Sequence, residues 1–270
     1  MKKVIYLLMS LSFVAFASCS DDDKENPSSE NGENGGDSNG NVSAVSVYKS
    51  GTENGHDYVD LGLTSGTKWA TANVGAAKPQ DYGNYYAWGE VTTKNTYNWN
   101  TYKYGTYNYD EDYSTLTKYN LSDNKTTLDL SDDAAYVNWG GKWRMPTVDQ
   151  WNELENQCYW VWTNSYNGSN IAGWIVSKAK SSSDKGLKIY DGETPSSSYS
   201  LNDAHIFLPA AGSRNDGDLD GIGAEGYYWS SSRNAIKPSD SWYVYFCSNY
   251  VDYGDYRSSG QSVRAVISGE

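Results

Sequence analysis

The sequence predicts an α+β domain in which two helices pack on a twisted, mostly antiparallel sheet with long loops. From His56 onward, short aromatic or β-branched runs are cut by Gly, Asn, Asp and Ser, a pattern typical of strands and turns. Only two segments carry the start signals of a helix. Aromatic residues make up 15% of the 270-residue chain, which argues against disorder despite its polarity.

The first 18 residues resemble a signal peptide rather than part of the fold. Lys2 and Lys3 precede an apolar run, Val4 to Ala17, that is too short to span a bilayer. Small residues then precede Cys19, as in lipoprotein signals that are cleaved before a Cys that becomes lipidated. An ordinary secretory signal with an unrelated Cys is the alternative. We expect a lipid anchor at Cys19 in the outer membrane, with the protein facing the cell exterior.

The residues after Cys19 predict a tether. The acidic run from Ser20 to Glu25 resembles the surface-export signal of Bacteroidetes lipoproteins, although a solvated spacer would have the same composition. Residues 27–41 contain no apolar side chain and are rich in Gly, Asn and Ser, which is typical of a flexible linker. The predicted division is therefore a signal peptide at 1–18, a tether at 19–47 and a domain at 48–270.

Nine segments of the domain are predicted strands, because each is rich in aromatic or β-branched residues and ends at turn-forming ones. They are Asp57–Leu61, Lys68–Val74, Tyr85–Glu90, Gly173–Ser177, Leu187–Tyr190, His205–Pro209, Tyr227–Ser230, Ser241–Phe246 and Ser262–Ile267. Residues 92–130 show little periodicity and predict a long loop insertion, either functional or disordered. We expect much of the tyrosine in segments 82–119 and 243–256 to be exposed.

The stronger helix signal follows Pro146. Thr147 to Gln150 form a capping-box pattern, with a hydroxyl at the N-cap and Gln three residues later. An apolar stripe at helical spacing follows, made by Val148, Trp151, Leu154 and Cys158. A second, shorter helix is predicted over Ser131 to Trp139, where acidic residues favour the N-terminus and two glycines end the segment.

Several segments match the motifs of one family, in order along the chain. They are Gly55–Leu63, Ser65–Ala70, Asn73–Ala76, Gly83–Glu90, Trp139–Thr147, Ile206–Gly212 with Arg214, Gly226–Ser232 and Ser262–Val266. Residues 52–268 therefore resemble the Fibrobacter-type major paralogous domain (FISUMP), which is abundant in surface lipoproteins of gut Bacteroidetes. The resemblance implies a C-type-lectin-like fold, shared with formylglycine-generating enzymes and with variable proteins of diversity-generating retroelements. We expect the motif tryptophans Trp69, Trp88, Trp139, Trp143 and Trp229 to plug the core, and Arg144 and Arg264 to stack or pair internally.

An enzymatic role is not expected, although the implied fold hosts enzymes. Formylglycine-generating relatives use two cysteines near the C-terminus, where this chain has only Cys247, because Cys158 lies in the predicted helix. Its two histidines, His56 and His205, are about 150 positions apart and suggest no convergent metal or acid–base site. A disulfide between Cys158 and Cys247 stays open as an alternative.

One acidic segment is a candidate metal site. Asp216, Asp218 and Asp220 alternate ahead of Gly221, like the opening of a calcium loop. Tyr227 occupies the position at which an EF-hand carries its bidentate Glu, so that loop type is excluded. A different calcium loop and a solvated acidic turn are the two interpretations that remain.

The C-terminal segment 231–261 is the candidate binding region. Trp242, Val244 and Phe246 are expected to face the core, which would turn Tyr243 and Tyr245 outward. Residues 252–259 then form a dense cluster of Tyr, Ser, Gly and Asp, the residue types that antibody loops use for binding. The predicted ligand-binding residues are Tyr243, Tyr245, Cys247, Ser248, Tyr250, Asp252, Tyr253, Asp255, Tyr256 and Arg257.

The same segment resembles the variable region of a diversity-generating retroelement target, in which Asn, Asp, Tyr, Ser, Gly and Cys interleave with framework residues. Undiversified members of the family carry similar ends, so this interpretation has an alternative. The formal charge of −13 argues against nucleic acid as a partner, because phosphates need a basic surface. We expect a non-catalytic surface lipoprotein that binds a protein or a glycan. The alternatives are a structural surface or fimbrial subunit and an enzyme of the formylglycine-generating type.

Overall fold

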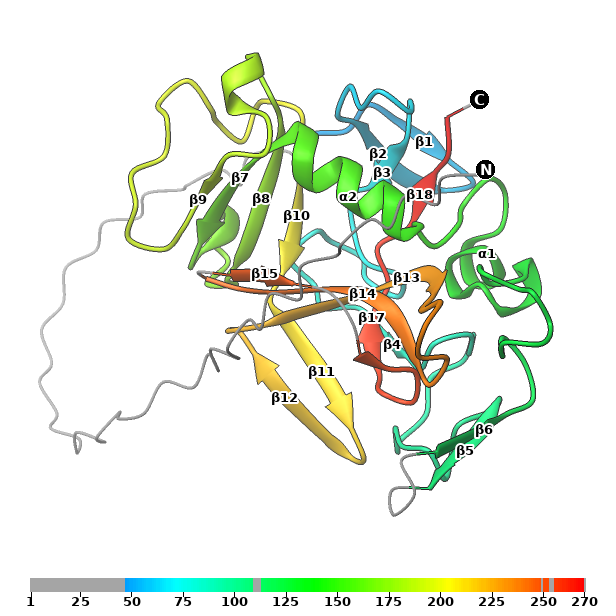
Figure 1. Ribbon diagram of the computed structural model, residues 1–270. Coiled ribbons are helices and arrows are strands. Elements are labelled where there is room, and N and C mark those ends of the chain that lie inside the picture. Colours follow the sequence, from blue (N-terminus) through cyan, green and yellow to red (C-terminus); the bar gives the residue numbers. More distant parts are fainter. Residues whose placement is uncertain (1–46, 109–112, 249, 253–254, 270) are drawn as a thin grey trace, which may run out of the picture. The chain divides into compact units, whose positions relative to one another are not determined.

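Most strands of the protein belong to three sheets, and a separate hairpin and two α-helices complete the described chain (Figure 1). The computed structural model describes residues 47–108, 113–248, 250–252 and 255–269. The expected mixed α+β architecture is confirmed, and most strand pairs are antiparallel as expected. Among the described residues, no helix is both long enough and apolar enough to cross a bilayer.

Two of the sheets have four strands each. The first has the order β1-β2-β3-β18, with β1 (Gly51–Glu53), β2 (His56–Asp60), β3 (Lys68–Ala70) and β18 (Val266–Ile267). The second has the order β10-β8-β7-β9, with β7 (Cys158–Thr163), β8 (Gly173–Lys178), β9 (Lys188–Ile189) and β10 (His205–Pro209). The last strand of the chain thus pairs with one of the first, which joins the two ends of the domain.

The third sheet has eight strands and carries the candidate binding region. Its main path is β12-β11-β13-β14-β15, and β4, β16 and β17 pair beside it. The strands are β4 (Tyr85–Tyr86), β11 (Ala211–Asn215), β12 (Asp218–Ile222), β13 (Gly226–Arg233), β14 (Asp240–Cys247), β15 (Tyr250–Asp252), β16 (Asp255–Tyr256) and β17 (Gln261–Ser262).

Strands β13 and β14 separate two hydrophobic cores. Their antiparallel register places Tyr228 opposite Val244, and Trp229 opposite Tyr243. Directly opposed residues share a face of a sheet, and neighbours along a strand point to opposite faces. Tyr228 and Val244 belong to one buried cluster, whereas Trp229 belongs to the other and Tyr243 packs against it. Both faces of this strand pair are therefore covered by apolar side chains.

The helix after Pro146 forms as expected. In α2 (Val148–Gln157), the Thr147 hydroxyl accepts a hydrogen bond from the Gln150 amide, and the Gln150 side chain accepts one from the Thr147 amide. Trp151 and Leu154 are buried, and α2 contacts β13 and β14. Cys158 is not helical, contrary to the expected stripe: the chain turns extended there and β7 begins.

The shorter helix is confirmed in part. Residues 130–132 form a 3-10 turn, η1 (Leu130–Asp132), and α1 (Ala134–Trp139) begins after it. Asp133 separates the two because its backbone is extended and its carboxylate accepts from the Tyr136 and Met145 amides. Two more 3-10 turns, η2 (Tyr166–Gly168) and η3 (Ser182–Asp184), lie in loops.

The expected strand over Ser262–Ile267 is divided in two, and β7 was not predicted. Between β17 and β18 the fully buried guanidinium of Arg264 donates to Asn73 Oδ1 and to the carbonyls of Ala70, Thr71 and Phe207, at 2.7–3.0 Å. This confirms the expected internal role of Arg264. Arg144 also acts internally, stacking over the Tyr136 ring at 4.4 Å.

The tyrosine-rich insertion is a folded part of the domain, which contradicts the expected exposure of its tyrosines. It contains the hairpin of β5 (Gly105–Asn108) and β6 (Tyr113–Leu116). Its buried aromatic residues are Tyr97, Trp99, Tyr102, Tyr104 and Tyr119. Buried Asp132 holds the segment by accepting hydrogen bonds from the hydroxyls of Tyr104 and Tyr119 and from Lys118 Nζ. The sequence pattern missed this because most of the buried side chains of the insertion are tyrosines, which look polar in the sequence.

Candidate binding surface

The candidate binding region folds back along β14. Strand β15 pairs with the second half of β14, placing Tyr245 opposite Asp252 and Cys247 opposite Tyr250. Strand β16 pairs with the start of β14, where Asp240 lies opposite Tyr256. The structure thus brings the two halves of the predicted binding segment together at the backbone. Tyr253 and the side chains of Tyr250, Asp252 and Asp255 lie outside what the structure describes.

Tyr243 and Tyr245 lie on the face opposite Val244 and Phe246, as the alternation predicts, but neither is exposed as expected. Trp242 is only half-buried and belongs to neither core cluster, so the expectation that it faces the core is wrong. Both tyrosines are themselves half-buried, because Tyr243 packs against the second core and makes an edge contact with Trp229 at 6.0 Å. Ser248 is half-buried and Cys247 is buried, so Cys247 presents little surface to a ligand.

A tyrosine cluster centred on Glu225 lies on this side of the sheet. The hydroxyls of Tyr227 and Tyr245 each donate to one carboxylate oxygen of Glu225 at 2.9 Å. Tyr227 also stacks with Tyr243, with ring centroids 5.9 Å apart. Burial and the Glu225 charge raise the pKa of Tyr227 above its usual range, so its hydroxyl stays protonated and donates. The sequence analysis did not predict that Glu225 belongs to this cluster. The only sequence signal for it is its position two residues before Tyr227.

Arg257 is buried, contrary to the prediction that it lies on the binding surface. Its side chain is 0% exposed. The guanidinium lies over the Trp88 ring at 4.6 Å and donates to the Tyr119 carbonyl at 2.7 Å. The exposed, Tyr/Ser/Asp-rich sequence around it suggested a surface, but Ser258 and Ser259 are buried too. The chain therefore leaves the surface after Tyr256.

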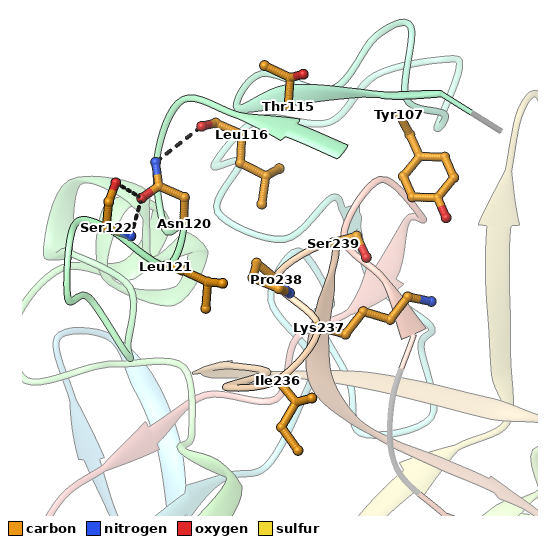
Figure 2. Close-up of a pocket in the computed structure, with 10 residues that line it drawn as sticks. All are labelled: Tyr107, Thr115, Leu116, Asn120, Leu121, Ser122, Ile236, Lys237, Pro238 and Ser239. Atoms are coloured by element: carbon orange, nitrogen blue, oxygen red, sulfur yellow. Dashed lines mark hydrogen bonds between the residues drawn. The ribbon is translucent and has the colours of Figure 1, made fainter. Parts of the chain in front are cut away.

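A groove opens where the insertion meets the loop between β13 and β14. It has a volume of about 740 Å³. Its apolar lining comes from Leu116 and Leu121 on one side and from Ile236 and Pro238 on the other, and Figure 2 shows Leu116, Leu121 and Pro238 approaching one another. The polar lining consists of Thr115, Asn120, Ser122, Lys237 and Ser239. Ile236 is 91% exposed and Leu121 is 64% exposed.

The wall at the Tyr107 side of the groove connects it to the candidate binding region. The Tyr107 ring stacks on buried Trp99, with centroids 5.5 Å apart, and contacts Tyr256 at 5.6 Å. Lys237 Nζ lies over the Tyr256 ring, 4.8 Å from its centroid. Tyr256 is thus shared between the predicted binding segment and the groove. Sequence reasoning placed residue 256 in the site but missed the groove, which needs two segments more than 100 residues apart.

The three aspartates of the candidate metal site do not form one. The segment is the hairpin of β11 and β12, in which Asn215 lies opposite Asp218 and Ser213 opposite Asp220. Asp216 occupies the turn and accepts a hydrogen bond from Asn98 Nδ2. Among the described residues, no group of three or more His, Cys, Asp or Glu side chains is arranged to hold a metal ion. A strand separates alternate carboxylates along a line, whereas a calcium loop curls them around a centre.

The reactive residue types elsewhere are used in packing. Cys158 is a free, buried thiol, so no disulfide joins it to Cys247, and burial raises its pKa to about 12. A protonated thiol is a poor nucleophile. Buried His205 contacts the Asp203 carbonyl through Nδ1 and the Tyr166 hydroxyl through Nε2, each at 2.9 Å. Cys19, the predicted lipidation site, lies outside the described residues.

The chain was compared with protein-family models, with curated proteins and with solved structures. None of the three comparisons yields a match.

Proposed function

We propose that this domain is a non-catalytic binding module that takes a protein ligand in the groove between the insertion and the 236–239 loop. The observation that carries the proposal is the exposure of two large aliphatic side chains, Ile236 and Leu121, on opposite sides of one concave surface. Exposed apolar groups gathered at a concavity are typical of interaction sites. The tyrosines of the candidate binding region extend the surface through Tyr256.

A protein ligand suits the groove better than a glycan does. The aliphatic side chains of Ile236, Leu121 and Leu116 offer no hydrogen bonds to sugar hydroxyls, but they can be buried by an apolar side chain of a partner. Tyr107 has little freedom to move because it is stacked on Trp99, so it adds contact area at a low cost in conformational entropy. The polar groups at the rim would then determine orientation.

We further propose a C-type-lectin-like fold and a lipid anchor at Cys19 in the outer membrane, facing outward, as the family resemblance implies. Support for the fold comes from the motif residues: Trp69, Trp88, Trp143 and Trp229 are fully buried, and Trp139 is 8% exposed. Support for the anchor comes from the apolar run and small residues before Cys19. Radiolabelled palmitate incorporation, absent after Cys19→Ala, would test the anchor, and surface proteolysis of intact cells would test the orientation.

Diversification of the C-terminal segment also remains a proposal. Buried Val244 and Phe246 suit a fixed framework, and half-buried Tyr243 and Tyr245 suit variable positions. A reverse transcriptase gene and an adenine-differing template repeat beside this gene would support it, and their absence from the genome would oppose it.

The binding function is tested by probing protein and glycan arrays with the full-length chain and three matched variants. Ile236→Ser and Leu121→Ser remove the aliphatic groups of the groove. Ile222→Ser makes the same change at a 48% exposed residue of β12 that does not line the groove. We expect protein hits whose affinity falls about tenfold or more in the groove variants, because each loses a buried aliphatic anchor, and is unchanged in Ile222→Ser.

Other results would point to the alternatives. Hits confined to glycans would refute a protein ligand, and hits that survive both groove variants would refute the groove as the site. In the second case, Tyr243→Ala and Tyr245→Ala would show whether the tyrosine face binds instead. Self-association of the chain in light scattering, with no other hit, would support the structural-subunit alternative.

A further inference from the structure

Among the residues that the structure describes, the guanidinium of one arginine, Arg214, makes no hydrogen bond. All five arginines are among the described residues, and four of them donate to backbone carbonyl oxygens: Arg144, Arg233, Arg257 and Arg264. For the Arg214 side chain, the described part of the chain provides neither a hydrogen-bond acceptor nor a carboxylate partner. A guanidinium carries five N–H donors in a fixed fork. Arg214 is therefore an exception among the arginines, and the reason for it must lie in its surroundings.

Arg214 is held in place without using those donors. It lies on β11 and is half-buried, with its guanidinium carbon 5.2 Å from the ring centroid of Tyr85. The ring itself is fixed, since its hydroxyl donates to the Ala211 carbonyl and the Tyr97 hydroxyl donates to the Tyr85 carbonyl. Stacking on an aromatic ring orients a guanidinium while leaving its edge free. Arg214 is therefore positioned but not neutralised.

The free guanidinium lines a polar pocket of about 440 Å³. That volume lies within the range of about 300–1,000 Å³ that is typical of small-ligand sites. The pocket lies between the insertion and the β11–β12 hairpin and is lined also by Asn84, Thr93, Asn95 and Gly217. No Asp or Glu is among its lining residues. It shares no lining residue with the groove proposed above for a protein ligand.

The second cation at the pocket is already paired. Lys94 Nζ lies 2.9 Å from the Glu90 carboxylate and also donates to the Thr101 carbonyl at 3.0 Å. The net positive charge of the pocket lining therefore comes from Arg214 alone. In a chain with a formal charge of −13, this leaves one unpaired cation in a concave site free of carboxylates.

We propose that this pocket binds the carboxylate of a small hydroxylated ligand, such as a sugar acid. The fork of Arg214 matches a carboxylate in a bidentate pair, and the amides of Asn84 and Asn95 and the hydroxyl of Thr93 suit neighbouring hydroxyl groups. A phosphate dianion would need a second free cation, and Lys94 is committed to Glu90. A neutral sugar would leave the guanidinium uncompensated.

Isothermal titration of the full-length chain with D-glucuronate tests the proposal. D-glucose is the neutral counterpart of this probe, and inorganic phosphate is the second anion. Arg214→Gln removes the charge, and Arg214→Lys keeps the charge but removes the fork. Lys68→Gln is the matched control, because Lys68 is stacked over a tyrosine in the same way, 5.3 Å from the Tyr58 centroid, on another sheet.

We expect glucuronate to bind, glucose not to bind, and phosphate to bind more weakly than glucuronate. Arg214→Gln should weaken glucuronate binding about tenfold or more, Arg214→Lys should weaken it by less, and Lys68→Gln should leave it unchanged. Equal loss in Lys68→Gln would show a non-specific charge effect and overturn the proposal. Absence of glucuronate binding, or tighter binding of phosphate or glucose, would overturn it as well.

The proposal stands independently of the groove. Ile236→Ser should leave glucuronate binding unchanged, and Arg214→Gln should leave protein hits in the groove unchanged. Thermal unfolding of each variant shows whether it is folded. If Arg214→Gln fails to fold, the chemical shifts of the Asn84 and Asn95 side-chain amides during glucuronate titration of the unmodified chain decide the question. They would move if the ligand enters this pocket, and unmoved shifts would refute the site.

Discussion

Two buried arginines, Arg257 and Arg264, join segments that are far apart in the sequence. Neither forms an ion pair within the described part of the chain. Each is satisfied mainly by carbonyl oxygens, which Arg257 takes from the insertion and Arg264 from β3 and β10. Burial lowers the pKa of Arg264 to about 10, so the side chain stays charged at neutral pH. A buried charge is tolerated when its donors are used, which is why both side chains stabilise the fold.

The first prediction concerns Arg257. Arg257→Met leaves the Tyr119 and Lys118 carbonyls without their donor and should lower the free energy of unfolding by about 3 kcal/mol. Arg214→Met, which removes no hydrogen bond, should change it by less than about 1 kcal/mol. Urea unfolding followed by tryptophan fluorescence measures both. Equal losses in the two variants would contradict the role of the Arg257 hydrogen bonds in stabilising the fold.

At the scale of elements, the insertion depends on one carboxylate. Asp132 ends η1 and accepts from Tyr104, Tyr119 and Lys118, which lie on both sides of the β6 strand in the sequence. Burial alone would raise the pKa of Asp132, but the hydrogen bonds from Lys118 and the two tyrosines outweigh it and hold the pKa below its usual range. The folded insertion therefore favours the ionised carboxylate.

The second prediction concerns that carboxylate. Asp132→Asn should lower the free energy of unfolding by about 2–4 kcal/mol at pH 7, because charge-assisted hydrogen bonds are lost at a buried site. Asp129→Asn is the control: Asp129 binds the same lysine but is 37% exposed, so solvent screening reduces its contribution. Amide hydrogen exchange within residues 92–130 should accelerate in Asp132→Asn only.

The pH dependence follows from the same depressed pKa. The unfolded carboxyl has a pKa near 3.8 and the folded one a lower value, so the unfolded chain binds the proton first as the pH falls. The contribution of Asp132 to the free energy of unfolding is therefore complete above about pH 5 and is lost progressively below pH 3.8. Denaturant midpoints between pH 5 and pH 3 should fall less steeply in Asp132→Asn than in the unmodified chain. Parallel slopes would show that Asp132 does not carry the effect.

For the domain as a whole, β13 and β14 link the two cores mechanically. Trp151 of one core donates to the Trp229 carbonyl at 3.4 Å, and Trp229 of the other core donates to the Tyr86 carbonyl at 2.7 Å. Because β13 and β14 contribute side chains to both cores, unfolding of one core removes packing from the strands that support the other. The two cores should therefore behave as one cooperative unit.

The fourth prediction tests that cooperativity. Phe246→Ala removes a fully buried ring from one core and should cost about 3–5 kcal/mol. We expect far-ultraviolet circular dichroism and tryptophan fluorescence to report one shared transition, shifted as a whole. Separate transitions for the two signals would show that the cores unfold independently.

Local signals predicted the helices well and the strands with errors at their ends. The Thr147–Gln150 capping box formed as predicted because its hydrogen bonds lie within four residues. The strand over Ser262–Ile267 was predicted whole but is divided around Arg264, whose four acceptors come from residues 55 or more positions away. The burial of the insertion was missed because its tyrosines look polar in sequence while their hydroxyls are satisfied inside.

By itself, the sequence determined the α+β class, the capped helix, the tryptophans of the core and the alternation that separates Tyr243 and Tyr245 from Val244 and Phe246. These features follow from hydrogen bonding and burial over a few residues. The tertiary structure alone decided that Arg257 is buried, that Asp216–Asp220 lies in a β-hairpin, and that Arg214 has no acceptor among the described residues. It also decided that a groove joins residues 107–122 to 236–239. Each of these depends on contacts between distant segments, for which the neighbouring residues in the chain carry no signal.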